Sequence, residues 1–551
     1  MCVSFLDIYQ TLPDSWFSYA PVKWQFAPSF LKWCATGSLM AGAAFLVFTL
    51  LALIFGRVYC SFICPFGILM DILRFFAKWP SKLSFLKKTA FGRFCAKRFA
   101  KLGFRPARNV LRYSLLALCA LSLIVGYAGL FGLLDPYSLF GKVMGDFVRP
   151  IAVDAANWTS EVLYSWGIYA VNPVEGEGAV ALPAFLFALC VLGLLAVASA
   201  LRGRIFCNTL CSVGSFLSLF SRYSLFRIRL DENACVHCGS CERTCKAECI
   251  DAKSGKIDAS RCVLCFDCAT NCPKGGISYG LNPAWFGKKK HPLEPSKIHS
   301  QKTVSRRAFA RQAAGMAALA CVAAKAKGSQ SEEAPQIGAP SPYGVDGDRP
   351  DKRLASPPGS VSVRHFLEHC TGCQLCTAVC PSQLLKPSIT QWGILGLIQP
   401  FMDFSKGFCV HACERCSEVC PAGAILPLSP QQKRTEKIGT AIFNPSLCVV
   451  QTEGTDCAAC GEHCPVQAIE MIPFGSQQRS LFIPHIHSEV CIGCGACEYV
   501  CPVRPHKAIV VQGLAVHTKA VVFQDSMRLY HPEKQSKRTL TPSGDADVFP
   551  F

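Results

Sequence analysis

Cysteine groups with the spacing of iron–sulfur ligands run through much of the chain. Of the 35 cysteines, 24 form six groups of four. In such a motif three close thiolates hold one cubane, and the fourth, usually before proline, ligates the other cluster of a pair. Structural zinc uses paired C-x2-C elements instead, so the sequence predicts six 4Fe–4S clusters. The predicted ligands are Cys235, Cys238, Cys241 and Cys245; Cys262, Cys265, Cys268 and Cys272; Cys370, Cys373, Cys376 and Cys380; Cys409, Cys413, Cys416 and Cys420; Cys448, Cys457, Cys460 and Cys464; and Cys491, Cys494, Cys497 and Cys501.

Exchange of the fourth thiol predicts how the motifs pair. Of the first two motifs, Cys272 is expected to complete the ligand set of Cys235, Cys238 and Cys241. Cys245 is expected to complete the set of Cys262, Cys265 and Cys268. Lys246 stands where proline is usual, and nearby Cys249 could compete as a ligand. For the other four motifs we expect nested pairing, with consecutive pairing as the alternative. Nesting exchanges Cys380 with Cys501 and Cys420 with Cys464.

Two further cysteine pairs belong to a repeat. Gly56-Arg57-Val58-Tyr59-Cys60 continues to Cys64-Pro65, and Gly203-Arg204-Ile205-Phe206-Cys207 continues to Cys211-Ser212. The repeat predicts two related half-units around one site. Cysteines four apart share a face of a helix, so these four thiols could hold another metal centre or form redox pairs. Structural thiols are the alternative. Arg57, Tyr59 and Arg204 are candidates for contacts with a quinol headgroup, and interfacial anchoring is the favoured alternative for them.

Apolar segments predict a membrane domain. Hydrophobic residues make up 51% of the chain and charged residues 17%, against about a quarter in typical soluble domains. Three apolar runs, at about 33–55, 111–134 and 181–201, are long enough to span a bilayer, which needs about 20 residues. The net charge of +19 lies largely beside these runs, so the positive-inside rule explains it and nucleic-acid binding is not expected.

The charge pattern also predicts orientation. The region between the first two runs and the region after the third are rich in lysine and arginine, so both should face the cytoplasm. The chain would then begin outside, and we expect an upstream helix. Ser305-Arg306-Arg307-Ala308-Phe309 and the apolar residues after it resemble a twin-arginine export signal, so the segment beyond it is expected in the periplasm. The alternative is a basic amphipathic helix in a cytoplasmic linker.

The predicted fold class is multi-domain, an α-helical transmembrane domain with α+β ferredoxin-like iron–sulfur domains. The expected order is a membrane domain, a two-cluster ferredoxin domain, a linker with the twin-arginine-like segment, a four-cluster ferredoxin domain and a polar tail. Their bounds are 1–230, 231–280, 281–360 (with the segment at 305–326), 361–523 and 524–551.

Taken together, these motifs carry a family resemblance. The part with Cys60 to Pro65 and two ferredoxin motifs resembles NapH-type membrane quinol dehydrogenases. The part from Ser305 onward resembles NapG/MauM-type four-cluster ferredoxins. The resemblance implies an inner-membrane protein that oxidises quinol and passes electrons to a periplasmic reductase, such as a nitrate reductase system, or a cytochrome. We expect menaquinol as the substrate.

Two other functions stay open at this stage. The first is a non-catalytic electron-transfer or maturation factor for another redox enzyme. The second is a relay with all six clusters on one side that feeds a cytoplasmic enzyme. No residue in the chain recognises nitrate, so the terminal acceptor is not predicted.

Overall fold

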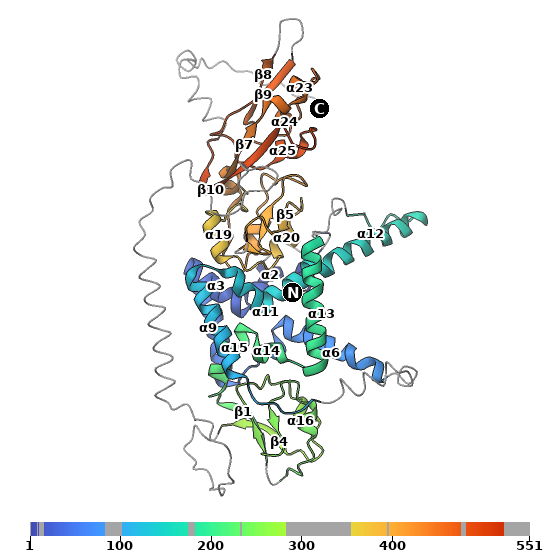
Figure 1. Cartoon of the computed structure of the whole chain (residues 1–551), viewed down its shortest axis with the longest axis vertical. Helices are drawn as coiled ribbons and strands as arrows, with labels where there is room; N and C mark the ends of the chain where they lie inside the picture. Colours follow the sequence, from blue (N-terminus) through green and yellow to red (C-terminus); the bar gives the residue numbers. More distant parts are fainter. Residues whose placement is uncertain are drawn as a thin grey trace, which may run out of the picture.

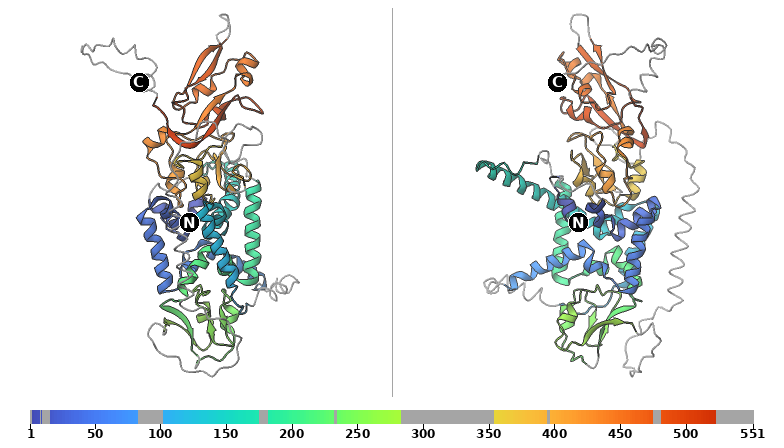
Figure 2. Two further views of the ribbon diagram at one scale, coloured as in Figure 1. Left: turned by 60° about the vertical axis from the view of Figure 1, so that its left-hand side comes forward. Right: turned by 180° about the vertical axis from the view of Figure 1, so that it is seen from behind.

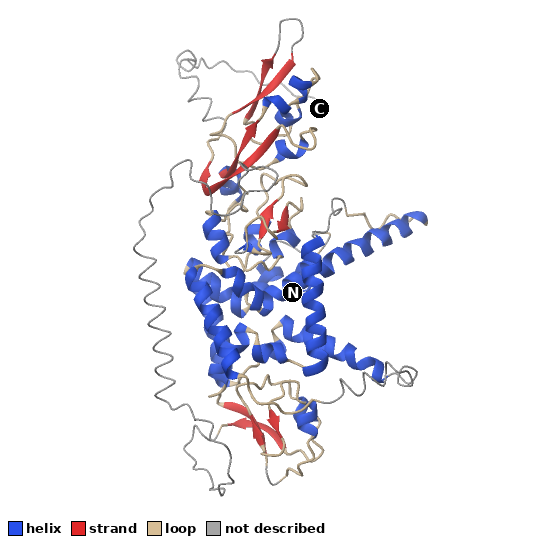
Figure 3. Cartoon of the chain, viewed as in Figure 1, coloured by secondary structure: helices blue, strands red, loops and turns tan. Residues whose placement is uncertain are grey.

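Three parts stack along one long axis in the computed structural model (Figures 1 and 3). The structure describes residues 2–7, 9, 16–82, 102–174, 182–231, 234–282, 354–393, 396–474 and 481–522. A small ferredoxin unit (226–282) lies at one end, a layer of helices in the middle, and a larger C-terminal unit (354–522) at the other end. The twin-arginine-like segment 305–326 and the polar tail 524–551 lie outside the described residues.

The helical layer contains short and long helices from the first 221 residues. These are α1 (Cys2–Leu6), α2 (Trp16–Lys23), α3 (Phe26–Thr36), α4 (Leu39–Ile54), α5 (Tyr59–Phe62), α6 (Pro65–Lys82), α9 (Asn109–Val125), α10 (Ala128–Leu134), α11 (Pro136–Lys142), the π-helix η1 (Val143–Val148), α12 (Arg149–Ser165), α13 (Leu182–Arg202), α14 (Ile205–Thr209) and α15 (Ser212–Ser221). In Figure 2 this layer separates the two cysteine-rich units in both views.

The three apolar runs do not form three uninterrupted helices. The first is divided at Gly37 and the second at Gly126, which both adopt the left-handed conformation that favours glycine and ends a helix. Within the described ranges, α13 is the one helix that is long and apolar enough to cross a membrane. The shorter α4, α9 and α15 are also apolar. The predicted spans at 33–55 and 111–134 thus each contain a helix break.

The predicted repeat has two similar local folds. In each copy a long apolar helix, α4 or α13, ends before a glycine with positive φ, Gly56 or Gly203. A short helix with the first cysteine follows, and the second cysteine immediately precedes another helix, α6 or α15. Pro65 is the first residue of α6. Proline is suited to this position because the backbone N–H of a first helical residue has no partner within the helix. Ser212 takes the same position in α15. The second copy therefore forms its helix α15 although it has serine in place of proline.

Short strands and helices build the ferredoxin unit. It contains β1 (Phe226–Leu230), α16 (Ser240–Thr244), β2 (Ile250–Asp251), β3 (Lys256–Ile257), α17 (Asp267–Thr270) and β4 (Ile277–Leu281). β1 pairs with β4 in antiparallel register and encloses both motifs, while β2 and β3 form a hairpin between them. The unit therefore begins at Phe226, a few residues before the expected boundary at 231.

The C-terminal unit repeats this plan. Its elements are α19 (Val363–His369), α20 (Leu375–Val379), β5 (Leu385–Pro387), β6 (Pro400–Met402), α21 (Arg415–Val419), α22 (Pro430–Thr435), β7 (Glu436–Phe443), the 3-10 helix η4 (Pro445–Leu447), α23 (Val449–Thr452), α24 (Ala459–Glu462), β8 (Ile469–Phe474), β9 (Leu481–Ile486), α25 (Ala496–Val500) and β10 (Ile509–Lys519). β7 pairs with β10 around the last two motifs, as β1 and β4 do around the first two.

Glycines bring the C-terminal unit against the helical layer. Gly132 in α10 and Gly141 in α11 face the backbone carbonyls of Thr371 and Cys373, with no room for a side chain between them. Gly145 likewise faces Gln374. The first cysteine loop of the C-terminal unit therefore rests directly on helix backbone.

This contact predicts that Gly132→Ala loosens the attachment of the C-terminal unit. The added methyl group would overlap the Thr371 carbonyl, and overpacking of this kind costs about 1–3 kcal/mol. The test places a protease site in the predicted linker and measures whether the cleaved C-terminal unit still co-migrates with the remainder. Gly193→Ala is the matched control, because a Cβ there has open space. Equal co-migration of both variants would contradict the prediction.

Candidate metal centres

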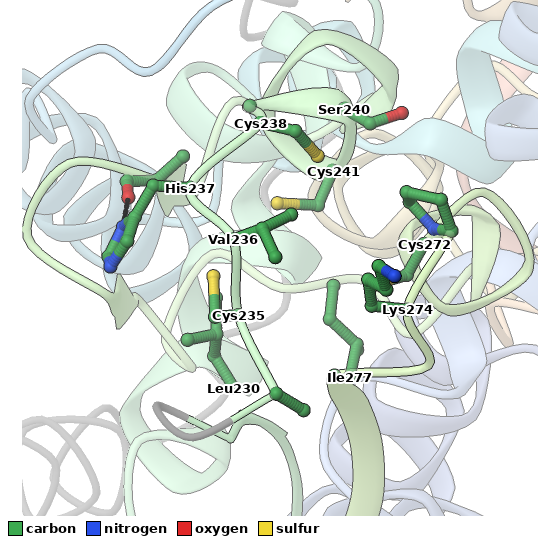
Figure 4. Close-up of a pocket in the computed structure, with 15 residues that line it drawn as sticks. Leu230, Cys235, Val236, His237, Cys238, Ser240, Cys241, Cys272, Lys274 and Ile277 are labelled. Carbon is green, nitrogen blue, oxygen red and sulfur yellow. Dashed lines mark hydrogen bonds between the residues drawn. The ribbon is translucent and has the colours of Figure 1, made fainter.

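The first cavity of the ferredoxin unit gathers one predicted ligand set. Cys235, Cys238 and Cys241 line it together with Cys272, which comes from the second motif. Figure 4 shows the sulfur atoms of Cys235, Cys238 and Cys241 near Val236, with Cys272 and Ile277 on the facing segment. His237 also lines the cavity, but its Nδ1 is 3.0 Å from the Ala252 carbonyl oxygen, so this ring nitrogen has a backbone partner. The arrangement is the one that exchange of the fourth thiol predicts.

The second cavity gathers the other set and one additional thiol. Cys262, Cys265 and Cys268 line it with Cys245, and Cys249 lines it as well. The sulfur atoms of Cys245 and Cys249 are 3.6 Å apart, and Cys249 is only 1% exposed. Cys249 thus lies where the sequence placed it, close enough to substitute for Cys245 as a ligand.

Motifs in the C-terminal unit pair consecutively, so the expected nesting was wrong. Helix α20 of the third motif packs on α21 of the fourth, and α24 of the fifth packs on α25 of the sixth. Burial raises the pKa of the Cys376 thiol, and Cys370, Cys373 and Cys420 raise it further. Burial also raises the pKa of the Cys416 thiol, and it is raised further by Cys409, Cys380 and Cys413. Cys420 therefore joins the third motif and Cys380 the fourth.

The last two motifs exchange in the same way. Burial raises the pKa of Cys497, with further contributions from Cys494, Cys491 and Cys464. Cys464 of the fifth motif therefore lies with the sixth, which leaves Cys501 for the fifth. Nesting fails because β7 and β10 close around motifs five and six alone. The spacing of the cysteines is compatible with nested and with consecutive pairing, so the sequence did not distinguish the two.

The two pairs of ligand sets in the C-terminal unit are in contact with each other. The Cys409 amide donates to the Cys494 carbonyl at 2.8 Å, and this contact joins the two pairs. At the other end, Thr371 and Cys373 rest on the helical layer. One buried apolar cluster runs from Cys268 of the ferredoxin unit through the layer to Leu375. The ligand sets are thus connected through packed protein.

The four C-x3-C cysteines come together inside the helical layer. Cys60, Cys64, Cys207 and Cys211, called here the central thiol site, are 3–4% exposed. Burial raises the pKa of Cys211, and Cys207, Cys64 and Cys60 raise it further. Among the described residues, no three His, Cys, Asp or Glu side chains converge closely enough to hold a single metal ion. The site therefore consists of four buried thiols that lie near one another.

Two buried arginines connect the halves of this site. Arg57 Nη2 donates to the Cys207 carbonyl at 2.8 Å, and Arg204 Nη1 donates to the Cys60 carbonyl at 2.7 Å. Burial alone would lower the pKa of Arg57, but the thiols of Cys60, Cys207 and Cys211 raise it. Both arginines are at most 1% exposed and Tyr59 is 4% exposed, so interfacial anchoring, the favoured alternative, was wrong for all three.

Lys246, the residue in place of proline, links the ferredoxin unit to the repeat. Its Nζ lies 3.2 Å from Asp71 of α6 and 3.0 Å from Asp267 of α17. Asp71 also accepts from Arg204 at 2.7 Å. Sequence reasoning treated Lys246 as a departure and missed Asp71, although a lone acid in a basic loop was a usable signal.

A polar group that the sequence did not reveal lies where the C-terminal unit meets the layer. Asp135, Tyr137, Lys142 and Asp146 form this interface polar group. Burial raises the pKa of Asp135 to about 6 and that of Asp146 to about 7. Burial lowers the pKa of Lys142 to about 8. Within the described structure, Asp135 Oδ1 and the Tyr137 hydroxyl have no hydrogen-bond partner.

Known families match both cysteine-rich and helical segments. A family described as a 4Fe-4S binding domain matches residues 38–83 and 183–231, the two copies of the repeat. A second family, described as a 4Fe-4S dicluster domain, matches residues 454–504. That segment holds ligands of the fifth and sixth motifs, so the match agrees with consecutive pairing.

Similar proteins include two of the ferredoxin type. The methylamine utilization ferredoxin-type protein MauM of Paracoccus denitrificans is 32% identical over 164 residues, 29% of this chain and 71% of that protein. The ferredoxin-type protein NapF of Escherichia coli is 31% identical over 161 residues, 29% of this chain and 86% of that protein. The chain belongs to this ferredoxin-type family. An uncharacterized protein of Methanocaldococcus jannaschii is 40% identical over 95 residues, but the match spans only 38% of that relative.

Membership of the ferredoxin-type family identifies the broad chemistry. The chain is a multi-domain iron–sulfur protein of electron transfer, with 4Fe–4S-binding domains. All-thiol sets around open spaces fit such clusters. Because ligands must be thiolates and burial raises the pKa of many of these thiols, metal binding here should release protons.

Consecutive pairing makes a specific prediction for this ferredoxin-type protein. Combining Cys373→Ala with Cys420→Ala should remove ligands of one cluster and lose about four iron atoms per chain. Combining Cys373→Ala with Cys380→Ala should damage two clusters and lose about eight. Iron analysis after anaerobic purification measures both. Loss of about eight by each double variant would favour nesting.

The Asp71 network makes a second prediction. Asp71→Asn should destabilise the protein by about 3 kcal/mol, because it leaves the buried Arg204 without its carboxylate. Burial alone would raise the pKa of Asp71, but Arg204 and Lys246 lower it. The stabilisation is therefore present above the ordinary carboxyl pKa of about 4 and is lost as the pH falls through the folded value.

Chemical unfolding at pH 7 measures this difference. Asp251→Asn is the control, because Asp251 is on the exposed hairpin and bonds mainly to nearby Ser254. A similar small effect of both changes would contradict the role of Asp71.

Proposed function

We propose that this ferredoxin-type protein carries electrons across a membrane, from quinol to a redox partner, through six 4Fe–4S clusters. Bound clusters of this type supply one-electron transfer, which suits a donor that yields two electrons. The observation that carries the proposal is the position of the ligand sets. Two lie on one face of the helical layer and four on the other, and a continuous buried core joins the two sides.

Several features of the helical layer support a place in a bilayer. The 21 residues of α13 extend over about 31 Å, which matches a hydrocarbon core of about 30 Å. Much of its surface is apolar and exposed, including Leu182, Leu194 and Val197. Residues of this kind in water would be costly, whereas lipid would cover them.

Two further helices resemble interfacial segments. α6 and α12 project from the layer near opposite ends of α13 (Figures 1 and 2). α6 exposes Phe75, Phe76 and Trp79, and α12 exposes Trp158. Aromatic side chains are enriched at both membrane surfaces, so the two helices would mark the two interfaces. The basic segment after α6 supports a cytoplasmic position for the ferredoxin unit and a periplasmic one for the C-terminal unit.

The interface polar group supports quinol oxidation at the C-terminal face. Quinol must lose two electrons and two protons. Asp135 and Tyr137 each have a buried oxygen without a partner among the described residues, and they lie on the side of the layer that carries Cys373. In this proposal Asp135 accepts one proton from quinol, and Asp146, which also has a buried carboxylate oxygen without a partner among the described residues, accepts the other. Tyr137 orients the ring by a hydrogen bond, and Lys142 balances the charge of the two carboxylates.

The arrangement favours this function over a relay with all clusters in the cytoplasm, because the two units lie on opposite faces of the layer. A maturation factor would need no quinol. Anaerobic membranes therefore provide the test: addition of menaquinol should reduce the clusters, seen by bleaching of their visible absorbance and by EPR. Clusters that stay oxidised with every quinol tried would overturn the proposal.

Tyr137→Phe should slow quinol-dependent cluster reduction by about tenfold, because it removes one hydrogen bond that orients the ring. Reduction by dithionite should stay unchanged, because the ligand sets remain. Tyr169→Phe is the matched control, since Tyr169 is 75% exposed at the end of α12. If Tyr137→Phe and Tyr169→Phe react alike with quinol, the headgroup binds elsewhere.

A further inference from the structure

We infer that Cys60, Cys64, Cys207 and Cys211 hold a seventh iron–sulfur cluster, and that it carries electrons between the ferredoxin unit and the C-terminal unit. The first half of this inference depends only on the central thiol site. The second half rests on the proposed function, because it assumes electron passage between the two faces of the layer.

The two copies of the repeat build the site in matching ways. Each copy supplies one thiol from a short helix, α5 or α14, and one from the residue that precedes α6 or α15. The Gly214 amide donates to Cys211 Sγ at 3.1 Å. In the other copy the Gly67 amide approaches Cys64. Amides aimed at sulfur stabilise thiolates at iron–sulfur clusters.

The equivalent glycines also allow the copies to interlock. A Cβ at Gly67 would meet the Cys60 carbonyl, and one at Gly214 would meet the Cys207 carbonyl. The arginine of each copy donates to the same carbonyl of the opposite copy. The repeated geometry thus holds all four thiols in place without a disulfide, since none of these cysteines is paired.

The charges around the central thiol site favour an anion there. Arg57 is fully buried, and no described carboxylate forms an ion pair with it. Its contacts are the Asn208 amide oxygen, two carbonyls and the neighbouring thiols. Arg112, 1% exposed, adds a second positive charge beside Gly214. A buried cation is costly without an anion. A cluster with four thiolate ligands carries net negative charge, so it would supply the missing counter-charge.

The site directly contacts the second ferredoxin cavity. The Ser61 hydroxyl donates to the carbonyl of Val263, which lines that cavity. Asn208 Nδ2 donates at 3.0 Å to the carbonyl of Ala247, another residue of the cavity. Arg57 and Arg112 both donate to Ser260, two residues before Cys262. No other element separates the two ligand sets.

Two buried tyrosines lie between the site and the C-terminal unit. Tyr59, next to Cys60 in α5, is near Cys64 and Asp135, and Tyr137 of α11 is near Asp135 and Cys373. Each electron that enters the central cluster from one side leaves it to the other, with no proton transferred and no covalent bond made or broken. The cluster would divide a long transfer across the layer into two shorter ones.

Metal analysis of the full-length protein tests the first half. We expect the combination Cys60→Ser with Cys211→Ser to lose one cluster, about four iron atoms with a cubane or about two with a two-iron cluster, together with equal acid-labile sulfide. Cys119→Ser is the control, since Cys119 is buried in α9 but contributes to none of the ligand sets. Unchanged iron and sulfide, bound zinc in place of iron, or a disulfide among the four cysteines by mass spectrometry would overturn the inference.

Arg57→Gln provides a test that retains all four thiols. Removal of a buried positive charge should lower the reduction potential of one cluster in an EPR-monitored titration and leave the iron content unchanged. A structural role alone would not shift a single component of the titration. If no component shifts, Arg57 does not face a cluster, and the inference fails.

Electron passage tests the second half. In sealed vesicles with the ferredoxin unit outside, external dithionite should reduce the clusters of the C-terminal unit in wild-type protein. The double serine variant should lose this reduction at least tenfold. Undiminished reduction in the variant would overturn the bridging role. External protease reports separately on the membrane proposal, because digestion of the C-terminal unit in these vesicles would refute that proposal and leave the iron result intact.

Discussion

The fourth thiol of each ferredoxin motif must reach the neighbouring ligand set, and the folds of both cysteine-rich units follow from this requirement. Cys272 and Cys245 cross between two cavities only because β1 and β4 hold their motifs side by side. The same constraint operates between β7 and β10. Each pair of motifs is thus a closed unit, and longer arrays arise by contact between units, as between Cys409 and Cys494.

Sequence reasoning located every thiol but not every relationship between thiols. The three-plus-one spacing was enough for the first ferredoxin pair, because two motifs allow only one exchange. Four motifs allow several exchanges, and cysteine spacing does not indicate which distant strands pair. Cys420 and Cys464 were therefore assigned to the wrong partners. The α+β ferredoxin character, in contrast, follows from local motifs and was predicted correctly.

Other features depended on contacts that no local pattern encodes. Gly37 and Gly126 looked like ordinary members of apolar runs, yet their left-handed conformations end helices. Arg57 and Arg204 looked like surface anchors, yet each is buried against a carbonyl of the opposite repeat. Asp135 and Tyr137 gave no motif at all, because their importance arises only from docking of the C-terminal unit. The export prediction still depends on the sequence alone.

The eight-residue gap between Cys448 and Cys457 has a consequence for how such proteins diversify. Its residues 453–456, which follow α23, form an exposed loop at the ligand set farthest along the C-terminal unit. An exposed loop can change in length and composition without disturbing the framework beneath it. Substitutions in this loop would therefore change the surface that a redox partner meets while the thiol positions stay fixed.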